Sequence, residues 1–187
     1  GSESGPIAVV YTVTLSKANN THSPVSFDID PTGGTAVAGL DFTDFAGGSI
    51  AVPHGSSTGT LTVTVLDDNF IEHLETIEAS ISSPADPATF INTGSAIATI
   101  TDSDDAVGSV NAILNSTQNG NEAGLVSMRF QVAISKQNQT GVPISFTIAP
   151  EAGGSATLGS DYTDFVTGTI SIPNNSSTGT FDVSVLP

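Results

Sequence analysis

The feature that most constrains this chain is an internal repeat. Residues 41–66 read DFTDFAGGSIAVPHGSSTGTLTVTVL and residues 161–186 read DYTDFVTGTISIPNNSSTGTFDVSVL, and 15 of these 26 positions are identical without a gap. The similarity continues upstream, where PVSF at 24–27 matches PISF at 143–146. Self-similarity over this distance predicts two copies of one domain in tandem.

The sequence begins and ends part-way through a repeat. The first residue aligns with Gly120 and the last aligns with Asp67, so the 187 residues hold about one and a half repeats. We expect a first domain over residues 1–105, the first copy, without its first strand. The second copy, residues 106–187, is expected to form a domain without its C-terminal strands.

Missing strands would leave open edges in both domains. An open strand edge is prone to pair with another chain. We therefore interpret the sequence as a window on a longer array, whose partners are neighbouring repeats or other copies of the same chain.

Apolar and polar residues alternate along most segments between turns. The period of two predicts half-buried strands, and Gly-, Pro- and Asn-rich stretches separate them at the spacing of a sandwich. No stretch holds a period of 3.6. We predict an all-β fold of two tandem antiparallel Greek-key β-sandwich domains, immunoglobulin-like, each with about seven strands when complete. The apolar positions are Val9/Tyr11/Val13, Val25/Phe27/Ile29, Leu61/Val63/Val65, Ile77/Ala79/Ile81, Met128/Phe130/Val132, Ile144/Phe146/Ile148 and Phe181/Val183/Val185.

The charge balance is strongly acidic. The chain carries 19 Asp and Glu against 3 Lys and Arg, a formal net charge of −16, which argues against nucleic acid and anionic membranes as partners because both are polyanions. No apolar run approaches the roughly 20 residues of a membrane span, so no membrane insertion is expected in this segment. The absence of cysteine excludes thiol catalysis and cysteine-based metal sites. Abundant Ser, Thr and Gly with little Lys favour an extracellular or cell-surface protein.

The acidic residues gather after two predicted strands of the first copy. Residues 1–105 hold 14 of the 19 acids, with one cluster at Asp67, Asp68, Glu72, Glu75 and Glu78 and another at Asp102, Asp104 and Asp105. Three basic side chains cannot neutralise both clusters. A divalent cation can, and Ca²⁺ takes six to eight oxygen ligands in a flexible geometry. The alternative is that these carboxylates are solvated on loops, and Glu78, which alternates with Ile77 and Ala79, is expected on the solvent face of a strand.

Several motifs together resemble the Calx-beta domain, a module of sodium/calcium exchangers and of large bacterial surface proteins. They are AGLDFT at 38–43, GSI at 48–50 followed by PHG at 53–55, VLDDNFIEHLET at 65–76, and ATITDSDD at 98–105. The order and spacing match over the first copy, and the second copy matches as far as Leu186.

The resemblance implies a seven-stranded sandwich that binds Ca²⁺ at one tip. Carried over by position, the implied metal ligands are Glu3, Asp41, Asp67, Asp68, Glu72, Glu75, Asp102 and Asp104. Asn69 and Ser103 depart from the family pattern, so we expect fewer or weaker ions. In the second copy only Glu122 and Asp161 have matching acids, and no complete site is expected there.

Catalysis is not expected. Residues 55–59, GSSTG, fit the G-x-S-x-G pattern of hydrolases, but that motif needs a strand–turn–helix context, and here it separates two predicted strands as a hairpin turn. The three histidines are isolated and expected at the surface. A glycosidase-type carboxylate pair is disfavoured, since there is no Trp to form a sugar platform.

The predicted function is a calcium-binding structural repeat of an extracellular surface, adhesin or fibre protein, with Ca²⁺ stiffening the domain and the linker between repeats. It would act together with a cell-surface or glycan target. The alternatives are a calcium-sensing regulatory domain attached to a transporter or other effector, and, less favoured, a carbohydrate-binding or enzymatic module.

Overall fold

A computed structural model describes residues 1–5, 7–82, 89–102 and 108–187. Contacts divide the chain into two compact units, Gly1–Asp68 with His73–Ser103, and Asn69–Glu72 with Asp104–Pro187. The predicted boundary at 105/106 lies outside the described residues. Within them, regular structure is β-strand apart from one short 3₁₀ helix, η1 (Glu122–Gly124), and no helix is long and apolar enough to cross a membrane.

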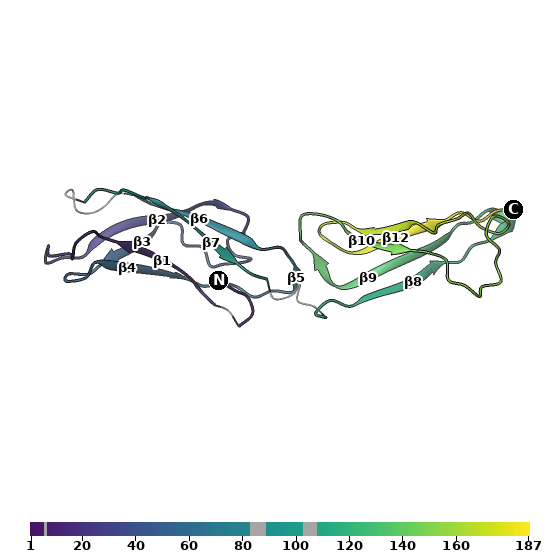
Figure 1. Ribbon diagram of the computed structural model, residues 1–187, viewed down its shortest axis with the longest axis horizontal. Coiled ribbons are helices and arrows are strands. Elements are labelled where there is room, and N and C mark those ends of the chain that lie inside the picture. The colour runs from purple at the N-terminus through teal and green to yellow at the C-terminus, as the bar shows by residue number, and fades with distance from the viewer. Residues whose placement is uncertain (6, 83–88, 103–107) are drawn as a thin grey trace. The chain divides into compact units, whose positions relative to one another are not determined.

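The first unit is an antiparallel sandwich of two sheets, as predicted (Figure 1). One sheet has the strand order β3-β2-β6-β7, and the other pairs β1 with β4. Its strands are β1 (Val9–Thr14), β2 (Val25–Gly34), β3 (Gly48–Val52), β4 (Thr58–Val63), β6 (Glu75–Ser82) and β7 (Ser95–Ile100).

The core of the first unit lies between these sheets. Burial alternates along β1, and the buried residues from both layers form one cluster that includes Tyr11, Phe27, Ile50 and Ile77. The predicted apolar faces are therefore the faces that pack, because every second side chain of a strand points to the same side.

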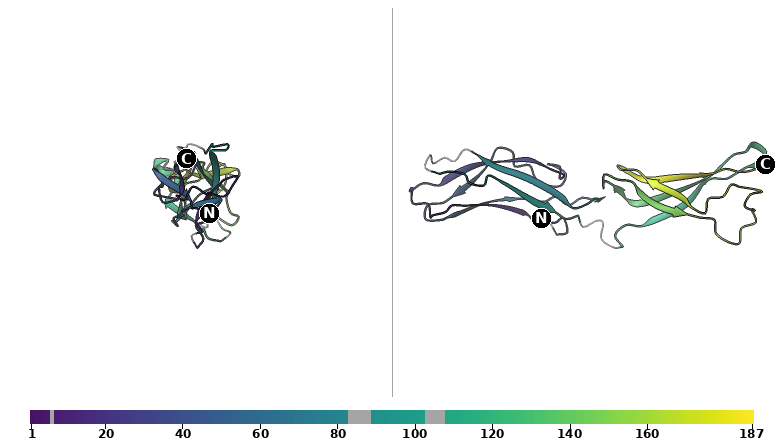
Figure 2. Two further views of the ribbon diagram at one scale, coloured as in Figure 1. Left: turned by 90° about the vertical axis from the view of Figure 1, so that its left-hand side faces the viewer. Right: turned by 45° about the horizontal axis from the view of Figure 1, so that its top comes forward.

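The second unit is also built of strands, which the further views in Figure 2 show from two sides. β9 pairs antiparallel with β12 and β8, and in parallel with β5, while β10 pairs with β11. Ile71 of β5 belongs to its core cluster, together with Val132 and Ile134. The strands are β5 (Phe70–Ile71), β8 (Ala112–Gln118), β9 (Met128–Asn138), β10 (Ile144–Ile148), β11 (Gly168–Ile172) and β12 (Ser176–Val183).

A buried asparagine closes the same turn in both copies. The Asn19 amide donates to the carbonyls of Ser23 and Val52 at 2.8 and 2.9 Å, and its Oδ1 accepts from Thr21. Asn138 repeats this arrangement with Val142 and Ile172. Both residues are buried. Their burial is tolerated because the side-chain amide makes all its hydrogen bonds inside the fold.

The GSSTG motif connects β3 to β4. The prediction of a hairpin is wrong, because β3 and β4 belong to different sheets and do not pair with each other, so the motif is a turn between the two sheets. The Ser56 hydroxyl accepts from the Thr58 amide inside the turn. Gly59 lies against the neighbouring strand so closely that a Cβ there would stand 2.3 Å from the Ala51 carbonyl oxygen, and Gly179 repeats this contact with Ser171. These glycines serve strand packing rather than chemistry.

Candidate metal centre

Backbone pairing within the first copy brings distant carboxylates to one place. The Glu3 amide donates to the Thr101 carbonyl at 3.1 Å, just beyond the end of β7. The Asp41 carbonyl accepts from the Leu66 amide at 2.9 Å, which joins the turn of Asp41 to the segment after β4. Glu75 opens β6 and pairs with Ile100 at the end of β7.

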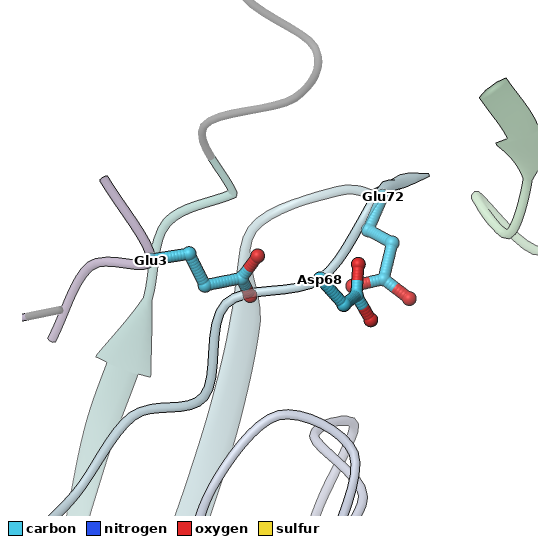
Figure 3. A group of neighbouring side chains, drawn as sticks. All are labelled: Glu3, Asp68 and Glu72. Atoms are coloured by element: carbon cyan, nitrogen blue, oxygen red, sulfur yellow. The ribbon is translucent and has the colours of Figure 1, made fainter. Parts of the chain in front are cut away.

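This arrangement forms two groups of neighbouring carboxylate side chains, with three residues in each. One oxygen each of Glu3, Asp68 and Glu72 lie within 4.8 Å of one another, and so do oxygens of Asp41, Glu72 and Glu75. Figure 3 shows the Glu3 carboxylate extending toward Asp68, with the Glu72 carboxylate beside that of Asp68. Glu72 belongs to both groups and is therefore the centre of the candidate site.

Three of the five gathered residues are buried. Glu3, Asp41 and Glu72 are 2 %, 3 % and 7 % exposed. Carboxylates withdrawn from water and packed together repel one another unless a counter-charge is near. The chain has three basic side chains, and one of them, Arg129, pairs with Asp182 at 2.6 Å on the strands β9 and β12.

Asp41 also has a local role in its turn. Its Oδ2 accepts from the Val37 amide, and in the second copy Asp161 accepts from Thr157 in the same way. In both copies, one carboxylate oxygen of this aspartate therefore accepts the backbone hydrogen bond that closes the turn. In the first copy, Asp41 additionally joins a carboxylate group.

The structure gathers five of the eight predicted ligands, namely Glu3, Asp41, Asp68, Glu72 and Glu75. Asp67 is exposed and Asp102 half-buried, and neither belongs to the two groups, which were sought among the described residues. Asp104 lies outside the described residues. Glu78 is exposed on β6, as expected for a solvent face. Every residue of the two groups was predicted as a ligand. The membership of Glu72 in both groups was not predicted, because it depends on the path of the loop that carries Glu72.

The second copy lacks a comparable arrangement within the described residues. Glu122, which matches Glu3, is exposed on η1, and its first turn is closed by the side chain of Asn121 accepting from Ala123. Asp161 is half-buried. Both carboxylate groups that were found belong to the first copy.

Comparison with known families agrees with these motifs. A sequence model of the Calx-beta domain matches residues 3–104. The chain belongs to the Calx-beta domain family. The matched residues include all five gathered carboxylates, so the family resemblance expected from the motifs is confirmed. No curated protein matches the chain by sequence.

Solved structures of calcium-binding domains are among those similar to this Calx-beta chain. The calcium binding domain CBD12 of CALX1.1 is 22 % identical, with a TM-score of 0.47 over 99 % of this chain and 71 % of that one. CBD12 from CALX1.2 is 21 % identical, with a TM-score of 0.48 over 98 % and 70 %. The apo form of Calx CBD1 is 22 % identical, with a TM-score of 0.46 over 55 % and 88 %.

The donor set of the first Calx-beta copy suits Ca²⁺. All five side chains offer carboxylate oxygens, which hard cations such as Ca²⁺ prefer, and no thiolate is available because the chain has no cysteine. The two groups can therefore hold Ca²⁺.

Proposed function

We propose that this chain is a Ca²⁺-binding module of a repeat protein, with binding confined to its first Calx-beta copy. The observation that carries the proposal is the pair of carboxylate groups that share the buried Glu72. A buried carboxylate cluster is costly unless a cation compensates its charge, and Ca²⁺ supplies two positive charges and accepts many oxygens.

The five gathered residues divide between two positions. Glu3 and Asp68 serve one with Glu72, and Asp41 and Glu75 serve the other with the same glutamate. Asp67, Asp102 and Asp104 remain predicted additional ligands from the adjoining segments. The role proposed for this site is binding rather than catalysis.

In this proposal the ion stabilises the acidic end of the domain and stiffens the link to the next repeat. The setting is an extracellular or cell-surface array, supported by the internal repeat, the abundance of Ser, Thr and Gly and the scarcity of lysine. A regulatory domain that passes the Ca²⁺ signal to an attached effector would use the same ligands.

Calorimetric titration of Ca²⁺ into the chain tests the proposal. We expect saturable binding, and at least a tenfold weaker affinity in Glu72→Gln, because both carboxylate groups lose a shared charge. Glu78→Gln is the matched control, since it removes the same charge from an exposed position of the same acidic run. Mg²⁺ should compete weakly, because it needs a tighter octahedral shell.

The proposal is wrong if the unaltered chain takes up no Ca²⁺, or if Glu72→Gln and Glu78→Gln weaken binding equally. The second result would show that the ion responds to overall charge and not to a built site.

A further inference from the structure

The strand β6 begins at a ligand of the metal centre. Its first residue, Glu75, is held on one side by β7, where it pairs with Ile100. On the other side β2 runs antiparallel to β6 (Figure 1), and this pairing ends with Gly34 opposite Ile77. Glu75 therefore lies beyond the end of the ladder between β2 and β6, where β2 no longer pairs with it.

Two threonines continue the contact past the end of this ladder. The Thr76 amide donates to Thr35 Oγ1 at 2.9 Å, so a side-chain oxygen accepts where a backbone carbonyl of a longer strand would. In return, the Thr35 amide donates to the Thr76 carbonyl at 3.0 Å and to Thr76 Oγ1 at 3.2 Å. The Ala36 amide donates to the same carbonyl at 3.1 Å. These hydrogen bonds join residues 35–36 to the immediate neighbour of Glu75.

The end of β2 is shaped for this contact. The register of β2 on β6 shifts between Pro31 and Gly33, and such a bulge changes the direction of the residues that follow it. Gly34 has a φ of +115°, and a Cβ at this position would stand 2.1 Å from the Thr76 carbonyl oxygen. Because only glycine allows so close an approach in this conformation, the backbone reaches Thr76 at the expense of a side chain at position 34.

The segment after Thr35 leads directly to a second ligand of the metal centre. The Val37 amide donates to Asp41 Oδ2, and the Asp41 amide donates to the Val37 carbonyl at 3.0 Å. A short stretch of backbone therefore connects the turn of Asp41 to Thr35, and Thr35 connects it to the start of β6. Asp41 and Glu75 belong to the same carboxylate group, together with Glu72.

Asp41 and Glu75 repel each other until a cation lies between them. One oxygen of each, and one of Glu72, lie within 4.8 Å of one another, and like charges at this separation favour moving apart. The turn of Asp41 forms without such neighbours, because Asp161 of the second copy makes the same turn bond and belongs to neither carboxylate group. The turn therefore fixes Asp41 locally, and the pair of threonines joins that turn to the start of β6.

We propose that Thr35 is a positioning residue of the metal centre. Its hydroxyl and its amide hold the turn of Asp41 against the start of β6, so that Asp41 and Glu75 stand close together before Ca²⁺ binds. The inference rests on the proposed function, and it adds that Ca²⁺ affinity depends on a residue outside the two carboxylate groups. A preorganised site loses less free energy in ordering its ligands when the ion binds.

Calorimetric titration of Thr35→Val with Ca²⁺ tests the proposal. Valine has nearly the shape of threonine without the hydroxyl, and Thr35 is exposed, so the variant should fold. We expect its Ca²⁺ affinity to be about fivefold weaker, the effect of one lost hydrogen bond. Thr35→Ser keeps the hydroxyl and should restore the affinity. Thr60→Val, at an exposed position of β4, is the matched control and should bind Ca²⁺ as the unaltered chain does.

Amide hydrogen exchange of the metal-free chain separates positioning from general stability. In Thr35→Val we expect the Thr76 and Val37 amides to exchange about fivefold faster, because a hydrogen bond that holds this segment is lost. Amides of the core strands, such as that of Ile50, should keep their rates. A merely structural role would instead raise the exchange of all the amides that open by global unfolding.

Three results would overturn the proposal. They are a Ca²⁺ affinity of Thr35→Val equal to that of the unaltered chain, a loss of affinity that Thr35→Ser shares, and a rise in exchange that is equal over the core strands. Failure of the proposed function would look different, because the unaltered chain would then take up no Ca²⁺ while Thr35→Val still raised the exchange of the Thr76 and Val37 amides.

Discussion

Tyr11 links the core of the first unit to the opposite sheet. It is buried on β1, and its hydroxyl donates to the Ile77 carbonyl of β6 at 3.1 Å. Burial raises the pKa of Tyr11 above its ordinary value of 10.0, because the phenolate would lose its hydration. The folded chain therefore holds this proton more tightly than the unfolded chain does.

This difference predicts alkaline sensitivity. As the pH rises through about 10, the unfolded chain loses its tyrosine proton first, so folding stability falls with increasing pH. Tyr11→Phe should flatten that decline, at a cost of about 1 kcal/mol near neutral pH for the lost hydrogen bond. Urea unfolding of both proteins between about pH 7 and pH 11 measures this, and parallel pH profiles would contradict it.

At the metal centre, single residues show what the sequence can and cannot predict. Glu72 and Glu75 stood in an acidic run, and their position after a strand was enough to mark them. Asp67, the immediate neighbour of Asp68, has the same chemistry but is exposed. Which of two adjacent carboxylates turns inward depends on the path of the loop, and a one-residue difference in a local pattern does not determine that path.

At the scale of elements, the close crossing of β3 and β4 depends on a glycine in each copy. A Cβ at Gly59 would meet the Ala51 backbone at 2.3 Å, and a neighbouring backbone cannot yield as a flexible side chain can. We expect Gly59→Ala to lower the free energy of unfolding by about 1–3 kcal/mol, the usual cost of overpacking.

Gly154→Ala is the control for this substitution. No atom lies within 4 Å of a Cβ at Gly154, so that variant should unfold within about 0.5 kcal/mol of the unaltered chain, as most surface changes do. Thermal and urea unfolding measure the stability of both variants. If Gly59→Ala were as stable as Gly154→Ala, β3 and β4 could move apart without loss of folding free energy.

Strands with one buried face were predictable from their alternation. The alternation at Val25, Phe27 and Ile29 predicted β2, and the same alternation in the second copy predicted β10. The degree of burial was not predictable. Phe27 is buried whereas Phe146 is half-buried, because β2 is covered by both β3 and β6 while β10 pairs with β11 among the described strands.

At the scale of the whole molecule, acidic charge is distributed unevenly. Residues 1–105 hold 14 of the 19 acids, and five of these meet at the metal centre. Removing Ca²⁺ would leave mutual repulsion concentrated in one part of the chain. Repulsion between close carboxylates falls when a cation lies among them.

We therefore predict that Ca²⁺ narrows the range of shapes that the chain samples in solution. Small-angle scattering in Ca²⁺ should give a sharper distance distribution than scattering in chelator, and Glu72→Gln should show a smaller difference between the two. An unchanged distribution on chelation, in a chain that calorimetry shows to bind Ca²⁺, would contradict the stiffening role and leave binding itself intact.

The buried asparagines of the two turns restrict how the chain can be modified after synthesis. Asn19 and Asn138 each begin an Asn-x-Thr sequence, which in secretory pathways is an acceptor for N-linked glycans. The two residues are 4 % and 0 % exposed and their side-chain amides donate inside the fold, so the folded chain offers no access to them. Asn115 in the exposed strand β8, which begins the sequence NST, is accessible. Of these three sequences, only the one on β8 could carry a glycan in the folded chain, so a sugar would stand on this strand and not in the two turns.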